Sequence, residues 1–178
     1  MRHPFVFVPP AKRGWVMAVL AALTLGALLV LNWIGRPLET PDAPWGIVSL
    51  QLAGSPSSAR AILNSWDALA RVHAGVSLGF DFLFPLLYAA SIGFACAWTA
   101  EILRQRHPGW AALGRRLAWG QALAALLDWV ENIALLVVLL EAPVAPWLQV
   151  AWGCAVPKFG LVALGLCYVA AGAVRRRL

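Results

Sequence analysis

Four long apolar stretches alternate along the chain with short polar connections. They cover residues 14–35, 75–100, 117–140 and 146–172. Each is long enough, as a helix rising about 1.5 Å per residue, to cross a hydrocarbon core of about 30 Å. The pattern predicts an all-α fold: a polytopic membrane protein whose four transmembrane helices form a bundle in a single membrane domain over residues 1–178.

The first stretch, Gly14–Gly35, carries no charged residue. It is too long for the core of a signal peptide and no A-x-A cleavage site follows it, so we expect a retained helix. Ala18, Ala22 and Gly26 recur on it at every fourth position. Such a stripe of small side chains predicts the close approach of another helix.

The segment 36–74 connects the first two stretches and contains a second kind of pattern. Apolar residues alternate with polar ones over 48–52, which predicts a short strand-like piece. Ser55 followed by Pro56 is typical of a helix start, with Ser55 as the cap. Apolar residues at helical spacing then predict an amphipathic helix of about four turns over Ser55–Val72. Two roles stay open for it: a cap on the bundle and a packed connector.

Composition supports the membrane assignment, since 61% of the residues are hydrophobic and 12% are charged. Soluble domains are about 25% charged. The net charge of +6 comes from basic clusters that flank the apolar stretches, which favours membrane topology over nucleic-acid binding. The three cysteines lie inside apolar stretches and are expected to act as small apolar filler.

The basic residues predict an orientation because positive charge favours the cytoplasmic side. Ten of them fall on one side of the predicted bundle: Arg2, Lys12, Arg13, Arg104, Arg106, Arg115, Arg116, Arg175, Arg176 and Arg177. Three fall on the other: Arg36, Arg60 and Arg71. Both termini are therefore predicted to be cytoplasmic.

Ionisable side chains interrupt the last three stretches, and such residues need a partner or a purpose inside a membrane. Asp128, Glu131 and Asn132 stand at positions i, i+3 and i+4, so they share one helix face. Gln121 extends that face toward the cytoplasmic end. Trp129 lies deeper than an interfacial tryptophan would and is a candidate wall of a cavity.

Lys158 in the fourth stretch is predicted to contact Glu131 or Asp128. Counted from Leu140, Glu131 lies about 13 Å and Asp128 about 18 Å below the outer end of the third stretch. Counted from Trp147, Lys158 lies about 16 Å deep. The link between the two stretches is short, so they are expected to pack as antiparallel neighbours with these side chains level.

In the second stretch, Asp81 and Pro85 form a related feature. Pro85 cannot donate a hydrogen bond to the carbonyl of Asp81, so a backbone acceptor is predicted to be free there. Ser77, Asp81, Pro85 and Tyr88 would share one face of a continuous helix. Asp81 and Tyr88, with Asn132 and Trp129, are the candidate ligand-binding residues.

Charge counting gives the site a functional interpretation. Three carboxyl groups face one lysine, and a low-dielectric site does not hold that excess unless an acid is protonated or a cation enters. Asp128, Glu131 and Lys158 are therefore the candidate catalytic residues. The competing interpretation is a structural ion-pair network that fixes the helix register.

Metal and cofactor chemistry is not expected. His3, His73 and His107 are scattered, with no metal-ligand spacing, and each is expected to be exposed or interfacial. No nucleotide-binding or nucleophile-elbow motif is present.

Several motifs resemble those of a group of bacterial membrane proteins without an established activity. They are L-A-G-S-x4-A-x-x-I-L-x-x-W at 52–66, D-F-L-F-P-L-L-Y at 81–88, L-L-D-W-V-E-N at 126–132 and P-K-F at 157–159. This resemblance implies a four-helix protein of the bacterial inner membrane and no particular function. At fold level alone, the chain also resembles the sterol-isomerase and sigma-2-receptor group, with a small helical bundle, a long first loop and acids in a lipophilic cavity.

Three functions follow as expectations. The first is binding, with acid-catalysed conversion as an extension, of a small lipophilic or cationic molecule that enters from the outer leaflet. The second is an accessory or assembly subunit whose polar network is structural. The third is a proton-coupled carrier, which would need oligomerisation to supply a repeat. The expected partners are the lipid bilayer, such a ligand, and a membrane-protein partner or a second copy of the chain.

Overall fold

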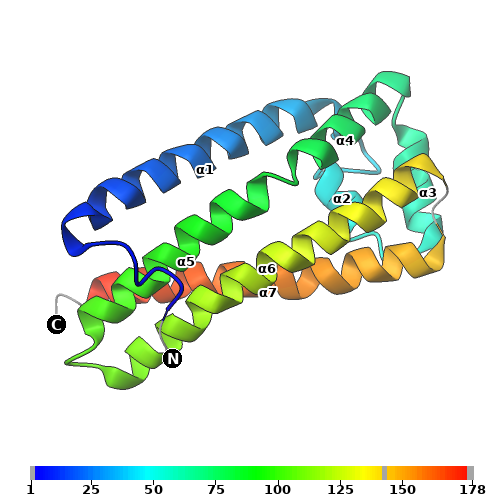
Figure 1. The fold of residues 1–178 in the computed structure, drawn as a ribbon. Coiled ribbons are helices and arrows are strands. Elements are labelled where there is room, and N and C mark those ends of the chain that lie inside the picture. The colour runs from blue at the N-terminus through cyan, green and yellow to red at the C-terminus, as the bar shows by residue number, and fades with distance from the viewer. Residues whose placement is uncertain (1–2, 142–143, 176–178) are drawn as a thin grey trace. The chain divides into compact units, whose positions relative to one another are not determined.

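The computed structural model describes residues 3–141 and 144–175, and it confirms the all-α fold. The chain is 82% helical, and the described residues contain no strand. Figure 1 shows the helices. In chain order they are η1 (Pro10–Lys12), α1 (Arg13–Gly35), η2 (Arg36–Leu38), α2 (Ile47–Gln51), α3 (Pro56–Ser65), α4 (Ala68–Phe80), α5 (Phe84–Leu103), α6 (Pro108–Leu140) and α7 (Ala145–Arg175).

Four helical stretches in the described part of the chain are long and apolar enough to cross a membrane. They are Pro10–Leu38, Phe84–Leu103, Pro108–Leu140 and Ala145–Arg175. The protein is therefore a multi-pass membrane protein with four candidate spans. The second span begins at Phe84, whereas the sequence predicted a continuous helix from Gly75 onward. That prediction was wrong because the chain leaves the helix at Asp81–Leu83.

The contacts divide the chain into two compact units, which are described separately. Unit 1 comprises Met1–Leu25, Leu86–Ala125 and Lys158–Leu178. Unit 2 comprises Gly26–Pro85 and Leu126–Pro157. The orientation prediction counts Arg2, Arg176 and Arg177, which lie outside the described residues.

Glycines allow the helices of unit 1 to pack closely. A Cβ atom added at Gly165 of α7 would lie 2.6 Å from Nε2 of Gln121 on α6. At Gly114 of α6, an added Cβ would overlap the ring of Tyr168. At both positions the glycine leaves room for a side chain of the neighbouring helix, and small residues are typical of such contacts between membrane helices.

Side-chain hydrogen bonds join neighbouring helices in unit 1, two to backbone carbonyls and one between hydroxyl groups. Gln121 Nε2 donates to Leu161 O at 2.8 Å, and the Tyr168 hydroxyl donates to Trp110 O at 3.1 Å. The hydroxyls of Thr24 on α1 and Ser91 on α5 lie 2.7 Å apart. Each bond satisfies a polar group that would otherwise be costly in an apolar interior.

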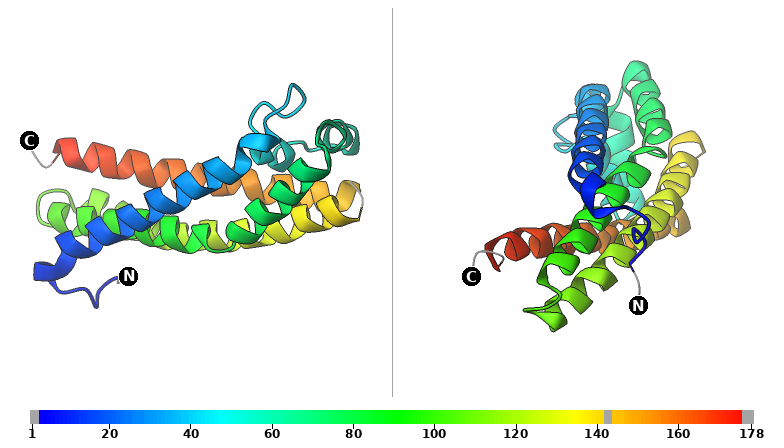
Figure 2. Two further views of the ribbon diagram at one scale, coloured as in Figure 1. Left: turned by 90° about the horizontal axis from the view of Figure 1, so that it is seen from above. Right: turned by 60° about the vertical axis from the view of Figure 1, so that its left-hand side comes forward.

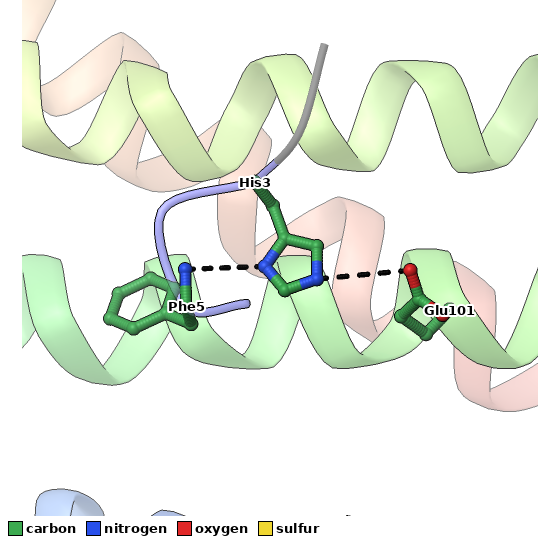
Figure 3. Close-up of polar contacts among 3 residues, drawn as sticks. All are labelled: His3, Phe5 and Glu101. Atoms are coloured by element: carbon green, nitrogen blue, oxygen red, sulfur yellow. Dashed lines mark hydrogen bonds and ion pairs between the residues drawn. The ribbon is translucent and has the colours of Figure 1, made fainter. Parts of the chain in front are cut away.

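The segment before η1 folds back onto α5, and its His3 is buried. His3 Nδ1 accepts the backbone N–H of Phe5 at 3.2 Å, while Nε2 lies 3.7 Å from a carboxylate oxygen of Glu101 (Figure 3). The expectation of an exposed histidine was therefore wrong at this position, and an interfacial location stays a prediction. The ring of Phe5 packs edge-on against Phe94, with centroids 5.5 Å apart.

Burial of His3 lowers its pKa. Loss of solvation disfavours the imidazolium, the carboxylate of Glu101 opposes this shift, and the positive charges of Arg13 and Arg115 reinforce it. The hydrogen bond from Phe5 acts in the same direction, because a protonated Nδ1 could not accept it.

Unit 2 has a larger apolar core, built from its short helices and the facing ends of α6 and α7. The C-terminal end of α6 and the first turns of α7 lie side by side (Figure 2). Ile62, Leu63 and Trp66 pack in one cluster with Leu135 of α6 and Leu148 of α7. The connecting segment 36–74 therefore packs over this part of α6 and α7, as expected of either a cap or a packed connector.

Two side chains of the connecting segment donate to backbone carbonyls within it. Trp66 is buried, and its Nε1 donates to Leu38 O at 2.9 Å. The guanidinium of Arg71 donates to Leu63 O at 2.8 Å, one of the carbonyls left unpaired at the end of α3. Arg71 thus closes the end of one helix from the first turn of the next.

The amphipathic helix predicted over Ser55–Val72 begins as predicted but is shorter. The Ser55 hydroxyl accepts the backbone N–H of Ser58 at 3.2 Å, and Pro56 is the first helical residue. The expected continuous helix over Ser55–Val72 is wrong, since α3 ends at Ser65 and α4 starts anew. Asp67 caps α4, accepting the N–H of Ala70 at 2.7 Å.

The strand-like piece predicted over 48–52 is also wrong, because Ile47–Gln51 forms the short helix α2. Gly46 and Gly54 flank it with φ values of 55° and 64°. Residues with a side chain rarely adopt this backbone conformation, so the two glycines set the turns on either side of α2. Local turn geometry here overrides the alternation of apolar residues.

The small-residue stripe of α1 does not pack within the chain. Ala18, Ala22 and Gly26 are exposed, and a Cβ at Gly26 would meet nothing within 4 Å. The side chains of α1 that are buried are Ala27 and Ile34, on the opposite side of the helix. No helix of the described chain packs on the stripe, and the close approach of another helix stays a prediction.

Candidate functional site

The candidate site lies in unit 2, where the chain is interrupted between α4 and α5. The N–H groups of Asp81, Phe82 and Leu83 still bond back to α4, to Ser77 O, Gly79 O and Phe80 O. Pro85, two residues further on, has no N–H to donate to Asp81 O. The predicted free carbonyl at Asp81 is therefore present.

Two side chains of α6 donate to the carbonyls of this break. Asn132 Nδ2 donates to Asp81 O at 3.0 Å, and Trp129 Nε1 donates to Phe82 O at 3.0 Å. Interrupted membrane helices are tolerated where neighbouring side chains satisfy the freed backbone groups in this way. The sequence pattern therefore identified the acceptor at Asp81 correctly, while the identity of its donor comes from the structure.

Asp128, Glu131 and Asn132 lie on one buried face of α6, as their spacing predicts. Their exposed fractions are 3%, 0% and 0%. Val130 and Ile133, between and beyond them, are 47% and 51% exposed. The face therefore carries two carboxyl groups and an amide within little more than one helical turn.

Asn132 is the most informative member of this face. Its amide nitrogen is used by Asp81 O, whereas its Oδ1 is buried and has no hydrogen-bond partner. An unsatisfied buried acceptor is uncommon in native structures and costs about 1–3 kcal/mol. This oxygen belongs to the same buried face of α6 as the carboxyl groups of Asp128 and Glu131.

Other polar groups on α4 are also buried or bonded. Ser77 is buried one turn before Asp81. His73 Nδ1 lies 3.0 Å from Ile34 O, and since a carbonyl only accepts, Nδ1 carries the proton in this contact. Asp81 itself is partly buried. His73 and Ser77 thus stand two turns and one turn before Asp81 on α4.

The remaining predicted site residues, Tyr88 and Lys158, belong to unit 1. Both are buried, at 6% and 4% exposed. The ammonium of Lys158 lies 4.6 Å from the ring centroid of its neighbour Phe159. The pairing of Lys158 with Glu131 or Asp128 stays a prediction. The predicted continuation of the polar face, Gln121, is buried in unit 1 and bonded to Leu161 O.

The described residues contain no group of three or more His, Cys, Asp or Glu side chains that could hold a metal ion. The structure instead adds functional candidates that the sequence did not single out. Phe82 O is one of them, and its only sequence signal is its place between Asp81 and Pro85.

Comparison of the chain with protein-family models, with curated proteins and with solved structures returned no match. The class that the fold itself defines is an all-helical, multi-pass membrane protein with an interrupted helix before its second candidate span.

Proposed function

We propose that this protein binds a small lipophilic or cationic molecule at the α4–α5 break. The observation that carries the proposal is the buried Oδ1 of Asn132, which has no partner and stands on one face with Asp128 and Glu131. A positively charged donor would satisfy this acceptor and offset the carboxylate charge. An apolar body would suit a site reached from the bilayer.

The proposal also assigns a place and roles. The protein lies in the bacterial inner membrane with both termini cytoplasmic, so the break faces the outer half of the bilayer. Asp128 or Glu131 is the cation partner, and Lys158 sets its ionisation. A carboxyl group held protonated there could transfer a proton to the ligand, which is the basis for conversion as an extension of binding.

Purification in a mild detergent followed by native mass spectrometry tests this proposal. We expect a small cationic molecule to remain with the wild-type protein and to be lost from a Glu131→Gln variant that still folds. Glu39→Gln is the matched control, because Glu39 lies in unit 2 and is exposed. Equal retention by Glu131→Gln, or no bound molecule in any sample, would overturn the proposal.

The second candidate is an accessory or assembly subunit without a ligand. It is favoured by the fact that both bonds from α6 to the break, from Asn132 and from Trp129, repair the backbone. In that case the polar face only fixes how α6 packs. A co-purifying membrane protein in place of a small molecule, unaffected by Glu131→Gln, would support this candidate.

A further inference from the structure

We infer that the ligand of this site is a protonated amine that retains at least one N–H, and not a quaternary ammonium ion. This inference rests on the proposed function and narrows it. The deciding group is again Asn132, because its Oδ1 calls for a hydrogen-bond donor and not only for a positive charge.

Five donors around the break are already in use. Asn132 Nδ2 and Trp129 Nε1 are committed to Asp81 O and Phe82 O. The backbone N–H groups of Asp81, Phe82 and Leu83 are committed to α4. None of these groups can turn to Asn132 Oδ1 without releasing a carbonyl of the break.

The amide oxygen of Asn132, in contrast, retains capacity. Asn132 Oδ1 is buried without a hydrogen-bond partner, and an amide oxygen can accept up to two hydrogen bonds. An ammonium group with N–H bonds can donate to Oδ1 and to a carboxylate at once. A trimethylammonium group supplies the charge alone and leaves Oδ1 unsatisfied.

A series of probes with one tail separates charge from donation. Dodecylamine and its N-methyl, N,N-dimethyl and N,N,N-trimethyl derivatives are all cations at neutral pH. We would measure their Kd values on the full chain in neutral detergent by native mass spectrometry. We expect a loss of about tenfold or more between the dimethyl and the trimethyl compound, the size expected when a buried acceptor loses its only donor.

Variants assign the preference to one atom. Asn132→Leu should bind the dimethyl and trimethyl compounds with equal Kd, within about twofold, because Oδ1 is gone. Asn132→Asp has nearly the same shape and retains an acceptor, so its preference should persist. Asn64→Leu, at an exposed position of α3, is the matched control and should behave as wild type.

The outcomes separate the two proposals. Equal binding of all four compounds to the wild type would overturn the N–H requirement and leave cation binding intact. A preference that survives in Asn132→Leu would overturn the assignment to Oδ1. If no compound binds the wild type, the proposed function itself fails. The wild-type series gives its answer even where Asn132→Leu does not fold.

Discussion

The two units pack their helices in different ways. In unit 1, glycines stand at the crossings: a Cβ at Gly165 would lie 2.6 Å from Gln121, and one at Gly93 would lie 3.2 Å from Ala118 O. In unit 2, Gly75 is the glycine at a helix contact, and its Cβ would lie 3.9 Å from Leu139, an ordinary distance. In unit 1, glycines therefore make room for side chains of neighbouring helices and, at Gly93, for a backbone carbonyl, whereas unit 2 fills its core with large side chains and short helices.

The buried amides show what this difference means for function. Gln121 in unit 1 and Asn132 in unit 2 are both fully buried, both donate to a carbonyl of another segment, and both retain an unpaired oxygen. Gln121 is surrounded on its own helix face by Leu117, Ala118 and Ala125. Asn132 has Asp128 and Glu131 there instead. The amide of Gln121 thus joins two helices of unit 1, whereas the amide of Asn132 stands within the acidic face of unit 2.

The largest effect is expected at Lys158, for which the sequence predicts an ion pair with Glu131 or Asp128. Removing one partner of a buried pair typically costs about 3–5 kcal/mol, because the other charge stays buried and unpaired. Lys158→Met should therefore unfold at a much lower temperature in detergent. Adding Glu131→Gln or Asp128→Asn should restore much of the loss.

A ligand-binding site also predicts how the same variants bind the amine probes. If the acids bind a cation, the rescued double variant should fold and fail to bind the amine probes. A purely structural network predicts a folded double variant with no other deficit. A stable Lys158→Met single variant would show that the lysine does not neutralise the acids, and the site would have to be redrawn without it.

Close packing in unit 1 is tested at Gly114. A Cβ there would overlap the Tyr168 ring, which is held by its bond to Trp110 O and by stacking on Trp110 with centroids 5.8 Å apart. Gly114→Ala should destabilise the protein by about 1–3 kcal/mol, as overpacking does. Gly160→Ala, where a Cβ meets nothing within 4 Å, is the control and should be neutral or slightly stabilising. A thermal unfolding series that ranks the two alike would contradict close packing as the basis of unit 1.

The sequence predicted the helices well where hydrophobicity runs long and unbroken. The first predicted span, Gly14–Gly35, differs by one residue from α1, Arg13–Gly35. The cap at Ser55 was also predicted, because a serine directly before a proline is typical of a helix start. The free carbonyl at Asp81 was predicted because Pro85 has no N–H to donate to it. Such local rules do not depend on what packs against the helix.

The interruptions within helices were not predicted, and the reason is physical. Helical spacing continues through Trp66 and Asp67, yet α3 ends there because Trp66 turns to bond Leu38 O and Asp67 caps a new helix. The break at Asp81–Leu83 likewise depends on donors from α6. Periodicity describes which face is apolar, whereas the end of a helix depends on partners that are distant in sequence. The shared face of Asp128, Glu131 and Asn132 was predicted because it lies within one unbroken helix.

A smaller effect is expected at the indole that donates to the break. Trp129→Phe removes the donor to Phe82 O while keeping most of the ring volume, so we expect a loss of about 1 kcal/mol in unfolding free energy. Trp147→Phe, at an exposed position of α7, should change stability by less than about 0.5 kcal/mol. Equal, negligible effects at both positions would mean that the break needs no donor from Trp129. The distinction between a repaired helix in unit 2 and intact helices in unit 1 would then weaken.

The smallest effect concerns the segment that docks on unit 1 through His3. Because burial lowers the pKa of His3 from 6.5, the docked segment favours neutral imidazole. The undocked chain then binds the proton first as the pH falls, so docking is fully stable above about pH 6.5 and weakens as the pH drops through the lowered pKa. Arg13 and Arg115 stay positive throughout this range and continue to oppose protonation, while Glu101 partly offsets them.

Hydrogen–deuterium exchange, corrected for the intrinsic pH dependence, measures this docking at the Phe5 amide, which donates to His3 Nδ1. Protection should fall between pH 7.5 and pH 5, and His3→Ala should show low protection at both values. The turn at Thr40–Ala43 in unit 2 has no histidine and serves as the internal control. Constant protection of Phe5 across this range would show that His3 does not titrate in place. The packing of Phe5 against Phe94 would then be enough to hold the segment on unit 1. The comparison between the units would then depend only on how their helices pack.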